Sequence, residues 1–215
     1  LKLIFAYVLF AFFSFLVVAI FVSNMTYNHI KKDKADALYK EANLVANTYA
    51  TDLYNNEASL DSVQTQLSAL ETYLDATVWI INPSGRILLD SSAPLDVDSI
   101  IMIDGFTPTV TADSYYTEGQ FFGYFKEDML SVLAPITSEF KVKGYVVIHY
   151  PLQKLNTATD GFLNISYIQL IMLFLLSLII LIFFTEMVYV PLRKITEATE
   201  QYASGNMHYE FGVES

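Results

Sequence analysis

Two uncharged apolar runs constrain the fold of this chain more than any other feature of its sequence. They are Leu3–Val22 and Ile165–Phe184, each about 20 residues long, and an α-helix of that length crosses a hydrocarbon core of roughly 30 Å. We therefore predict two transmembrane helices. The alternative for the first run is a cleaved signal peptide, but signal cores are shorter, about 7 to 15 residues, and no small-residue cleavage site follows Val22.

Two spans place both termini on one side of the membrane and residues 23–164 on the other. That segment has roughly 140 residues, a usual size for one domain. Lys31, Lys32 and Lys34 follow the first span, and the positive-inside rule would keep them in the cytoplasm. Large domains, however, are translocated largely regardless of charge. We therefore expect an extracytoplasmic domain at residues 23–164, with both termini cytoplasmic and the chain in the cell membrane.

The composition argues against several functional classes. The sequence has no cysteine, which rules out disulfides, thiolate metal sites and cysteine nucleophiles. A formal net charge of -11 argues against nucleic-acid binding, because that depends on Lys and Arg to neutralise phosphates. The sequence shows no glycine-rich phosphate loop, no Gly-x-Ser-x-Gly motif and no paired histidines at ligand spacing. We expect no catalytic residue, no metal site and no cofactor in this region.

The first part of the middle segment has the periodicity of helices. Asn28–Leu53 continues out of the first span with apolar residues three and four positions apart, which indicates one long amphipathic helix. Its apolar positions are Ala35, Leu38, Ala42, Val45, Ala46 and Tyr49. The same spacing predicts a second helix at Leu60–Leu74.

The periodicity then changes to that of strands. Two apolar runs around a Pro-Ser-Gly sequence predict a hairpin with its turn at Asn82–Gly85. Three further strands are predicted at Gln120–Phe125, Met129–Ile136 and Lys143–Tyr150, with the polar segment Thr137–Lys141 linking the last two. Two helices followed by about five antiparallel strands predict an α+β domain.

The order of these elements resembles the sensory half of bacterial two-component sensor histidine kinases. The resemblance is carried by the hairpin IINPSGRILLDS, by LAPITSEFKVKGYVVIHYPL before the second span, and by VPLRKITEATEQYASGN after it. It implies an extracytoplasmic domain of PAS-like, single-Cache-like fold that binds an unknown extracellular stimulus. We expect the chain, which starts at Leu1, to be a segment of a longer polypeptide. The resemblance places the kinase domain, its ATP and Mg, and the contact with a cytoplasmic response regulator in the missing part.

The residues after the second span resemble the first helix and exit of a HAMP linker. The matching residues are Pro191, Leu192, Ile195, Ala203, Gly205 and Asn206. A three-four-three spacing presents one apolar stripe to a parallel partner helix, formed by Leu192, Ile195, Thr199 and Tyr202. Pro191 either starts this helix or bends its junction with the span. We expect a homodimer whose signal-coupling residues are Pro191, Leu192, Ile195 and Gly205.

Two other functions remain open. A chemoreceptor uses the same outer and HAMP pieces without a kinase, and only downstream sequence separates the two. A non-signalling anchored binding protein would not need the striped helix after the span. His208 is followed by Tyr209, whereas the acceptor motif of these kinases has an acidic residue directly after His, so we do not expect His208 to be phosphorylated.

An aromatic segment at residues 115–125 is the first candidate for ligand recognition. Aromatic side chains line small-molecule pockets that a few polar groups make selective. The candidate ligand-binding residues are Tyr115, Tyr116, Phe122 and Tyr124 as walls and Arg86, Lys126 or His149 as polar groups. The plainer alternative is an aromatic core with a membrane-facing edge, and a structural role for His149.

Acidic residues around the same segment are a second candidate. They are Asp96, Asp98, Asp104, Asp113, Glu118, Glu127 and Asp128. Such a surface would bind divalent cations or cationic peptides by relieving repulsion between carboxylates. The plainer alternative is a solvated acidic loop.

Overall fold

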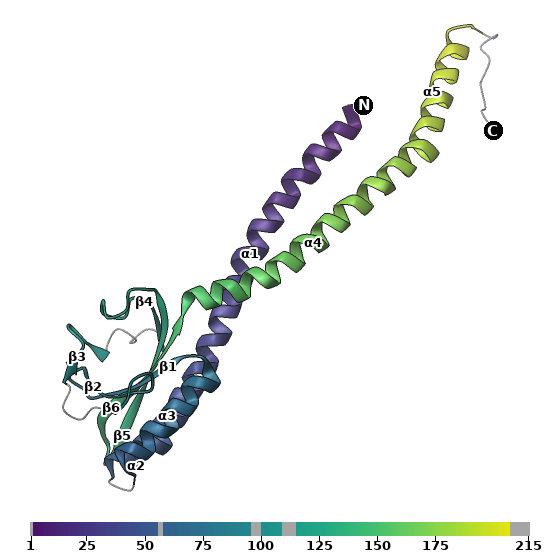
Figure 1. The fold of residues 1–215 in the computed structure, drawn as a ribbon. Coiled ribbons are helices and arrows are strands. Elements are labelled where there is room, and N and C mark those ends of the chain that lie inside the picture. Colours follow the sequence, from purple (N-terminus) through teal and green to yellow (C-terminus); the bar gives the residue numbers. More distant parts are fainter. Residues whose placement is uncertain (1, 56–57, 96–99, 109–114, 207–215) are drawn as a thin grey trace. The chain divides into compact units, whose positions relative to one another are not determined.

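The computed structural model describes residues 2–55, 58–95, 100–108 and 115–206 (Figure 1). The chain divides into two compact units, Val22–Phe162 and the pair Leu1–Phe21 with Leu163–Ser215. In the first unit, helices and a six-stranded antiparallel sheet form an α+β domain. The predicted fold class is confirmed.

The helix predicted to continue out of the first span is present. α1 runs without a break from Lys2 to Val45 and is followed by a π-helical turn, η1, at Ala46–Ala50 and by the short α2 at Thr51–Tyr54. The residues predicted to face the core are the buried ones, namely Ala35, Leu38, Ala42, Val45 and Ala46, and Tyr49 is partly buried. Periodicity therefore identified the packing face of this helix correctly.

α3 spans Leu60–Leu74, the bounds predicted for it. Ser59 caps it, since the Ser62 N–H donates to Ser59 Oγ at 3.2 Å. The helix ends at Asp75, whose backbone is left-handed with φ of 53°. The buried face of α3 carries Val63 and Leu67 against the sheet.

The sheet contains β1 (Thr77–Ile81), β2 (Arg86–Asp90), β3 (Ile101–Met102), β4 (Tyr116–Gly119), β5 (Met129–Ser138) and β6 (Lys141–Pro151). Their order across the sheet is β3-β2-β1-β6-β5-β4, and every neighbouring pair is antiparallel. The short β3 was not predicted. The link between β5 and β6 is also tighter than predicted, because the strands extend to Ser138 and from Lys141 and only Glu139 and Phe140 turn.

The strand predicted at Gln120–Phe125 is wrong, because these residues form a turn. Phe121 and Phe122 have φ of 40° and 55°, and the neighbouring Gly119 and Gly123 also have positive φ. A β-strand needs negative φ, so aromatic composition was outweighed by the two glycines that flank the pair. The strand of this region is β4, just before the turn.

The hairpin between β1 and β2 turns where it was predicted. The Gly85 N–H donates to the Asn82 carbonyl at 3.0 Å, and Asn82 Oδ1 accepts from the N–H groups of Ser84 and Arg86 at 3.0 and 2.8 Å. Gly85 has φ of +86°, and a Cβ there would lie 2.7 Å from the Cβ of Phe106. Only glycine fits this position.

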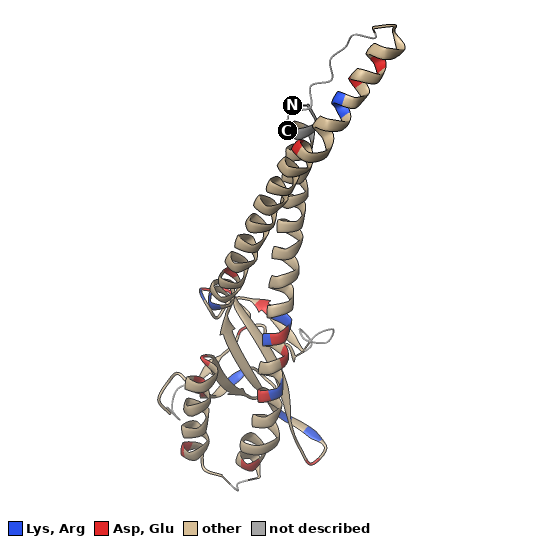
Figure 2. Cartoon of the chain, turned by 90° about the vertical axis from the view of Figure 1, so that its right-hand side faces the viewer, with Lys and Arg blue, Asp and Glu red and all other residues tan. Residues whose placement is uncertain are grey.

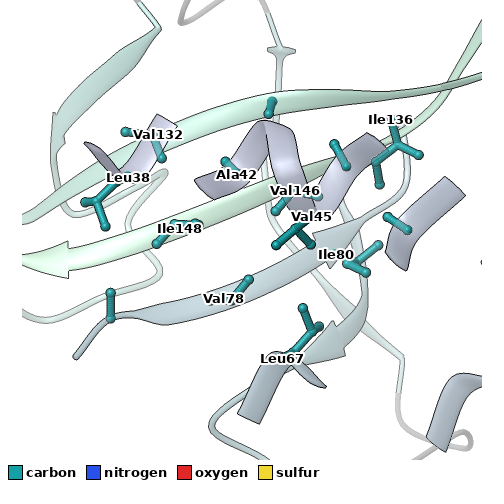
Figure 3. Packing of buried hydrophobic residues seen from close by; sticks show 14 of the residues in the cluster. Leu38, Ala42, Val45, Leu67, Val78, Ile80, Val132, Ile136, Val146 and Ile148 are labelled. Atoms are coloured by element: carbon teal, nitrogen blue, oxygen red, sulfur yellow. The ribbon is translucent and has the colours of Figure 1, made fainter. Parts of the chain in front are cut away.

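The main core lies between one face of the sheet and the helices α1 and α3 (Figure 3). Val78 and Ile80 of β1 and Val146 and Ile148 of β6 point toward this side and are fully buried. Figure 3 shows Leu38 and Val45 of α1 and Leu67 of α3 packed on them. Full burial of one such side chain contributes about 1.5–3 kcal/mol, so this face supplies much of the stability of the domain.

The other unit is built from apolar helix. α4 spans Leu152–Phe184 and belongs to this unit from Leu163 onward, the π-helical η3 spans Thr185–Tyr189, and α5 spans Val190–Ala203. In the described ranges, two helical stretches are long and apolar enough to cross a membrane, with mean hydropathy of 2.4 within Tyr7–Tyr54 and 2.8 within Leu152–Ala203. Figure 2 shows the apolar lengths of both free of charged residues. The hydroxyls of Tyr7 and Ser177 are hydrogen-bonded, which joins α1 to α4 inside this unit.

Candidate ligand-binding site on the second face of the sheet

The second face of the sheet is the one that α1 and α3 do not cover. Because side chains alternate along a strand, residues next to the core-facing ones point to this side. Its residues include Trp79, Ile81, Ile87, Ser131, Leu133, Tyr145, Val147 and His149. Phe121, Phe122, Phe125, Phe106 and Ile103, from the connections between strands, pack over them.

Trp79 is the centre of this aromatic cluster. The ring of Phe125 stacks on it at 5.2 Å and 14°, while Tyr124 meets it edge to face at 4.8 Å. His149 and Phe121 lie at 4.3 and 6.1 Å from it, also in edge contact. The Trp79 side chain is consequently almost fully buried, with 1% of the residue exposed.

His149 is the most deeply buried polar group of the cluster. It is 0% exposed, and its Nδ1 lies 2.7 Å from Ser131 Oγ on the neighbouring strand. Burial lowers the pKa of His149 from 6.5 to about 3, so the imidazole is neutral at physiological pH. Among the residues that the structure describes, neither the Nε2 of His149 nor the Nε1 of Trp79 has a hydrogen-bond partner.

The aromatic turn, Gln120–Phe125, covers this cluster. Phe121 and Phe125 each contact both Trp79 and His149. The turn is closed by its own backbone, since the Phe125 N–H donates to the Gln120 carbonyl and the Tyr124 N–H to the Phe121 carbonyl, both at 3.1 Å.

One carboxylate lies beside the cluster. Asp90 is the cross-strand neighbour of Trp79, and its Oδ1 accepts from the Ser92 N–H and hydroxyl at 2.9 and 2.7 Å. Burial and the negative charge of Asp90 both raise the pKa of Tyr124. The rim of the cluster is therefore negative, while its interior is neutral.

The predicted ligand residues divide between the two faces. Phe122, Tyr124 and His149 lie in the second-face cluster. Tyr115 and Tyr116 pack instead against the core beneath α1, where the Tyr115 ring lies 5.0 Å from that of Tyr39. The Tyr115 hydroxyl donates to Asp36, and this hydrogen bond raises the pKa of Tyr115 to about 12. The structure thus does not gather the four predicted walls into one site.

The last two predicted ligand-binding residues are cationic. Lys126 is exposed, just past the aromatic turn. Arg86 begins β2, and its Nε is buried without a hydrogen-bond partner.

The acidic residues are also dispersed. Glu118 forms an ion pair with Lys31 at 2.9 Å. Glu127 and Asp128 line a cavity of about 310 Å³ with Tyr27, Leu152, Gln153 and Asn156. Asp104 is exposed, and Asp96, Asp98 and Asp113 lie outside the described residues. In the described part of the chain, no three or more His, Asp or Glu side chains are grouped as metal ligands.

The residues predicted to couple the signal lie in α5 and directly after it. Pro191 occupies the first turn of α5, directly after η3. Leu192 and Ile195 are 56% and 52% exposed. Gly205 has φ of +92° and ends the helix, as the N–H groups of Gly205 and Asn206 donate to the carbonyls of Tyr202 and Gln201. His208 lies outside the described residues.

Sequence reasoning missed Trp79, Phe121, Phe125 and Ser131 as members of the cluster. One signal for Trp79 was available, because β1 is apolar at consecutive positions and must therefore bury both of its faces. A second was the alternation on β6, which puts His149 and Val147 on one face and Ile148 on the other.

Comparison with known proteins gives a fold match and no sequence match. No family model and no curated protein matches the sequence. The sensor domain of the V. cholerae histidine kinase DctB superimposes with a TM-score of 0.50 over 66% of this chain, at 14% identity. The two domains share a fold. The Cache/PAS-like sensor fold implied by the resemblance is thereby confirmed, while this chain covers 58% of that DctB chain.

Two further solved structures are less similar. A domain of a putative sensory box/GGDEF family protein from Vibrio parahaemolyticus has a TM-score of 0.49 at 14% identity and covers 67% of this chain and 62% of its own. The ligand-binding domain of the Campylobacter jejuni chemoreceptor Tlp3, in complex with L-valine, has a TM-score of 0.44 at 14% identity and covers 69% and 64%.

Proposed function

We propose that this chain is the sensory and signal-transmitting part of a transmembrane receptor. Residues 23–164 form its extracytoplasmic input domain and detect an extracellular stimulus. The second span and α5 carry the signal to a cytoplasmic output. The shared fold with a histidine-kinase sensor domain and the two apolar helices support this assignment.

One observation carries the proposal, namely the direct connection between the sheet and the second apolar helix. β6 pairs with both β1 and β5 in the middle of the sheet, and it ends at Pro151. α4 begins at the next residue, Leu152, and helix continues through η3 to the end of α5 at Ala203. His149 is three positions before α4, so a shift of β6 at the candidate site is passed to α4 without an intervening loop.

The exposed stripe on α5 supports a homodimer. Leu192 and Ile195 are large apolar residues that stay more than half exposed in a single chain. Packing against the same stripe of a second copy would remove them from water, as in a parallel coiled coil. Pro191 has no N–H to donate, so the helix at this junction lacks one stabilising bond and can change its packing there.

The output of the receptor is proposed to be a histidine kinase, which would use ATP and Mg and a response regulator through domains beyond this chain. A chemoreceptor is the alternative. Sequence downstream of Ser215 separates them, because a kinase requires a phosphoacceptor histidine and an ATP-binding domain.

Cross-linking at α5 tests the proposal, since the chain has no native cysteine. In membranes, Ile195→Cys should form an intermolecular disulfide, because the stripe faces a second copy. Arg193→Cys, on the polar side where Arg193 bonds Glu197 at 2.7 Å, is the matched control and should cross-link weakly. Equal yields at both positions would contradict the proposed parallel dimer.

A further inference from the structure

Two buried polar atoms of the second-face cluster lack hydrogen-bond partners in the described part of the chain. They are Trp79 Nε1 and His149 Nε2, and both are enclosed by rings. Buried polar groups in folded proteins nearly always have a partner, and exceptions call for an explanation. A second state of the site, in which a ligand supplies the partners, is such an explanation.

The aromatic turn that covers these atoms has a strained backbone, and its backbone hydrogen bonds lie within the turn itself. Phe121 and Phe122 are bulky residues at positive φ, which L-residues adopt at a cost. The backbone hydrogen bonds found within the aromatic turn join Phe125 to Gln120 and Tyr124 to Phe121, so they would survive a movement of the whole turn. Gly119 and Gly123 have open space where a Cβ would be.

The rings of the turn have different roles. Phe121 lies 4.5 Å and Phe125 4.8 Å from the ring of His149, and both also contact Trp79. Phe122, the neighbour of Phe121, contacts Phe106 at 5.5 Å instead. Phe121 and Phe125 are therefore the side chains whose removal uncovers the two unpartnered atoms.

We propose that the aromatic turn is a lid over a binding site for a small aromatic ligand that bears a hydrogen-bonding group. Phe121 and Phe125 fill this binding site, here called the seat, when no ligand is bound. This inference rests on the proposed sensory function. A planar ring replaces the contacts that these side chains make with Trp79 and His149. The Trp79 N–H donates to an acceptor on the ligand. His149 Nε2 forms a hydrogen bond with the ligand as well, in addition to the one that its Nδ1 makes with Ser131.

Charge narrows the ligand class. Among the described residues, the ring and hydrogen-bond partners found for Trp79 and His149 are aromatic rings and the Ser131 hydroxyl, and none of these partners is a cation that would hold a carboxylate or phosphate. Asp90 beside Tyr124 repels an anion at the rim and accommodates an amine. The seat thus suits a neutral or amine-bearing aromatic molecule.

Fluorescence of Trp79 tests this seat directly, because Trp79 is the single tryptophan of the chain. The full chain in lipid vesicles is titrated with benzyl alcohol, and its emission should change saturably. Phe121→Ala should lower the apparent Kd at least tenfold, because the competing ring is gone. Phe122→Ala, which removes the same atoms one residue away, should change it less than twofold.

Probe chemistry and a second variant complete the test. Toluene lacks the hydrogen-bonding group and cyclohexylmethanol lacks the aromatic ring, so each should bind at least fivefold more weakly than benzyl alcohol. Equal effects of Phe121→Ala and Phe122→Ala, no response in Phe121→Ala, or a stronger response to tetramethylammonium would overturn the inference. If Phe121→Ala does not fold, Phe121→Leu against Phe122→Leu gives the same ranking.

The test also separates this inference from the proposed function. Benzyl alcohol that changes Trp79 emission without changing the cross-linking of Ile195→Cys would support the seat and contradict signal transmission. Cross-linking that responds to another stimulus while Trp79 emission stays constant would support transmission and overturn the seat.

Discussion

At the scale of single residues, His149 makes the stability of the sheet domain depend on pH. Burial lowers its pKa to about 3 in the folded chain, against 6.5 when unfolded. Between these values only the unfolded chain binds the proton, so this contribution to stability is complete above pH 6.5 and is lost as pH falls toward 3. The slope is about 1.4 kcal/mol per pH unit. We expect the midpoint temperature of thermal unfolding, followed by Trp79 fluorescence, to decrease as the pH is lowered from 6.5 to 5.

Two variants check the cause. His149→Phe removes the titrating group and should flatten this part of the pH profile, whereas His29→Gln, at an exposed histidine of α1, should leave it as in the wild type. Parallel profiles for His149→Phe and the wild type would show that other groups cause the pH dependence.

At the scale of elements, the close approach of β6 to β1 depends on Gly144. A Cβ at this position would lie 2.5 Å from the Ile81 carbonyl oxygen and 2.8 Å from the Tyr54 hydroxyl. Gly144→Ala must therefore push strands apart, and we expect a loss of about 1–3 kcal/mol, measured as a lower midpoint of thermal unfolding. Gly161→Ala in α4 meets nothing within 4 Å and should be neutral or stabilising, as alanine favours helix. A loss at Gly161 as large as at Gly144 would contradict this account.

The junction of η3 and α5 gives a second prediction at this scale. Pro191→Ala restores a backbone donor and should stiffen the helix that enters α5. In a receptor with its output domain, we expect a weaker response at unchanged ligand affinity. The response is measured as output activity, and the affinity by a binding titration. The same response in variant and wild type would refute the coupling role of Pro191.

At the scale of the whole molecule, the proposed topology is open to a direct measurement. Tyr73 on α3 and Glu200 on α5 are both exposed, and the two proposed spans put them on opposite sides of the membrane. In intact cells, a membrane-impermeant maleimide should label Tyr73→Cys and not Glu200→Cys. Labelling of Glu200→Cys alone would show the opposite topology, with residues 23–164 in the cytoplasm. The lysines after the first span would favour that orientation by the positive-inside rule.

The sequence by itself determined the features that follow from local pattern. The two apolar helices, the bounds of α3, the buried stripe of α1 and the turn at Asn82–Gly85 each depend on residues a few positions apart, and each was predicted. The two-residue β3 has too few residues to show a period, so it was missed.

The tertiary structure alone decided which residues meet at the candidate site. Ser131, Trp79 and His149 come from three strands and are brought together by the register of β5, β6 and β1. Tyr115 and Phe121 are six positions apart but pack in clusters on opposite faces of the sheet. The chain leaves β4 through a turn whose Gly119, Phe121, Phe122 and Gly123 have positive φ. Strand register and turn conformation depend on the packing of the whole domain, so a linear pattern of aromatic residues could not reveal which face each would join.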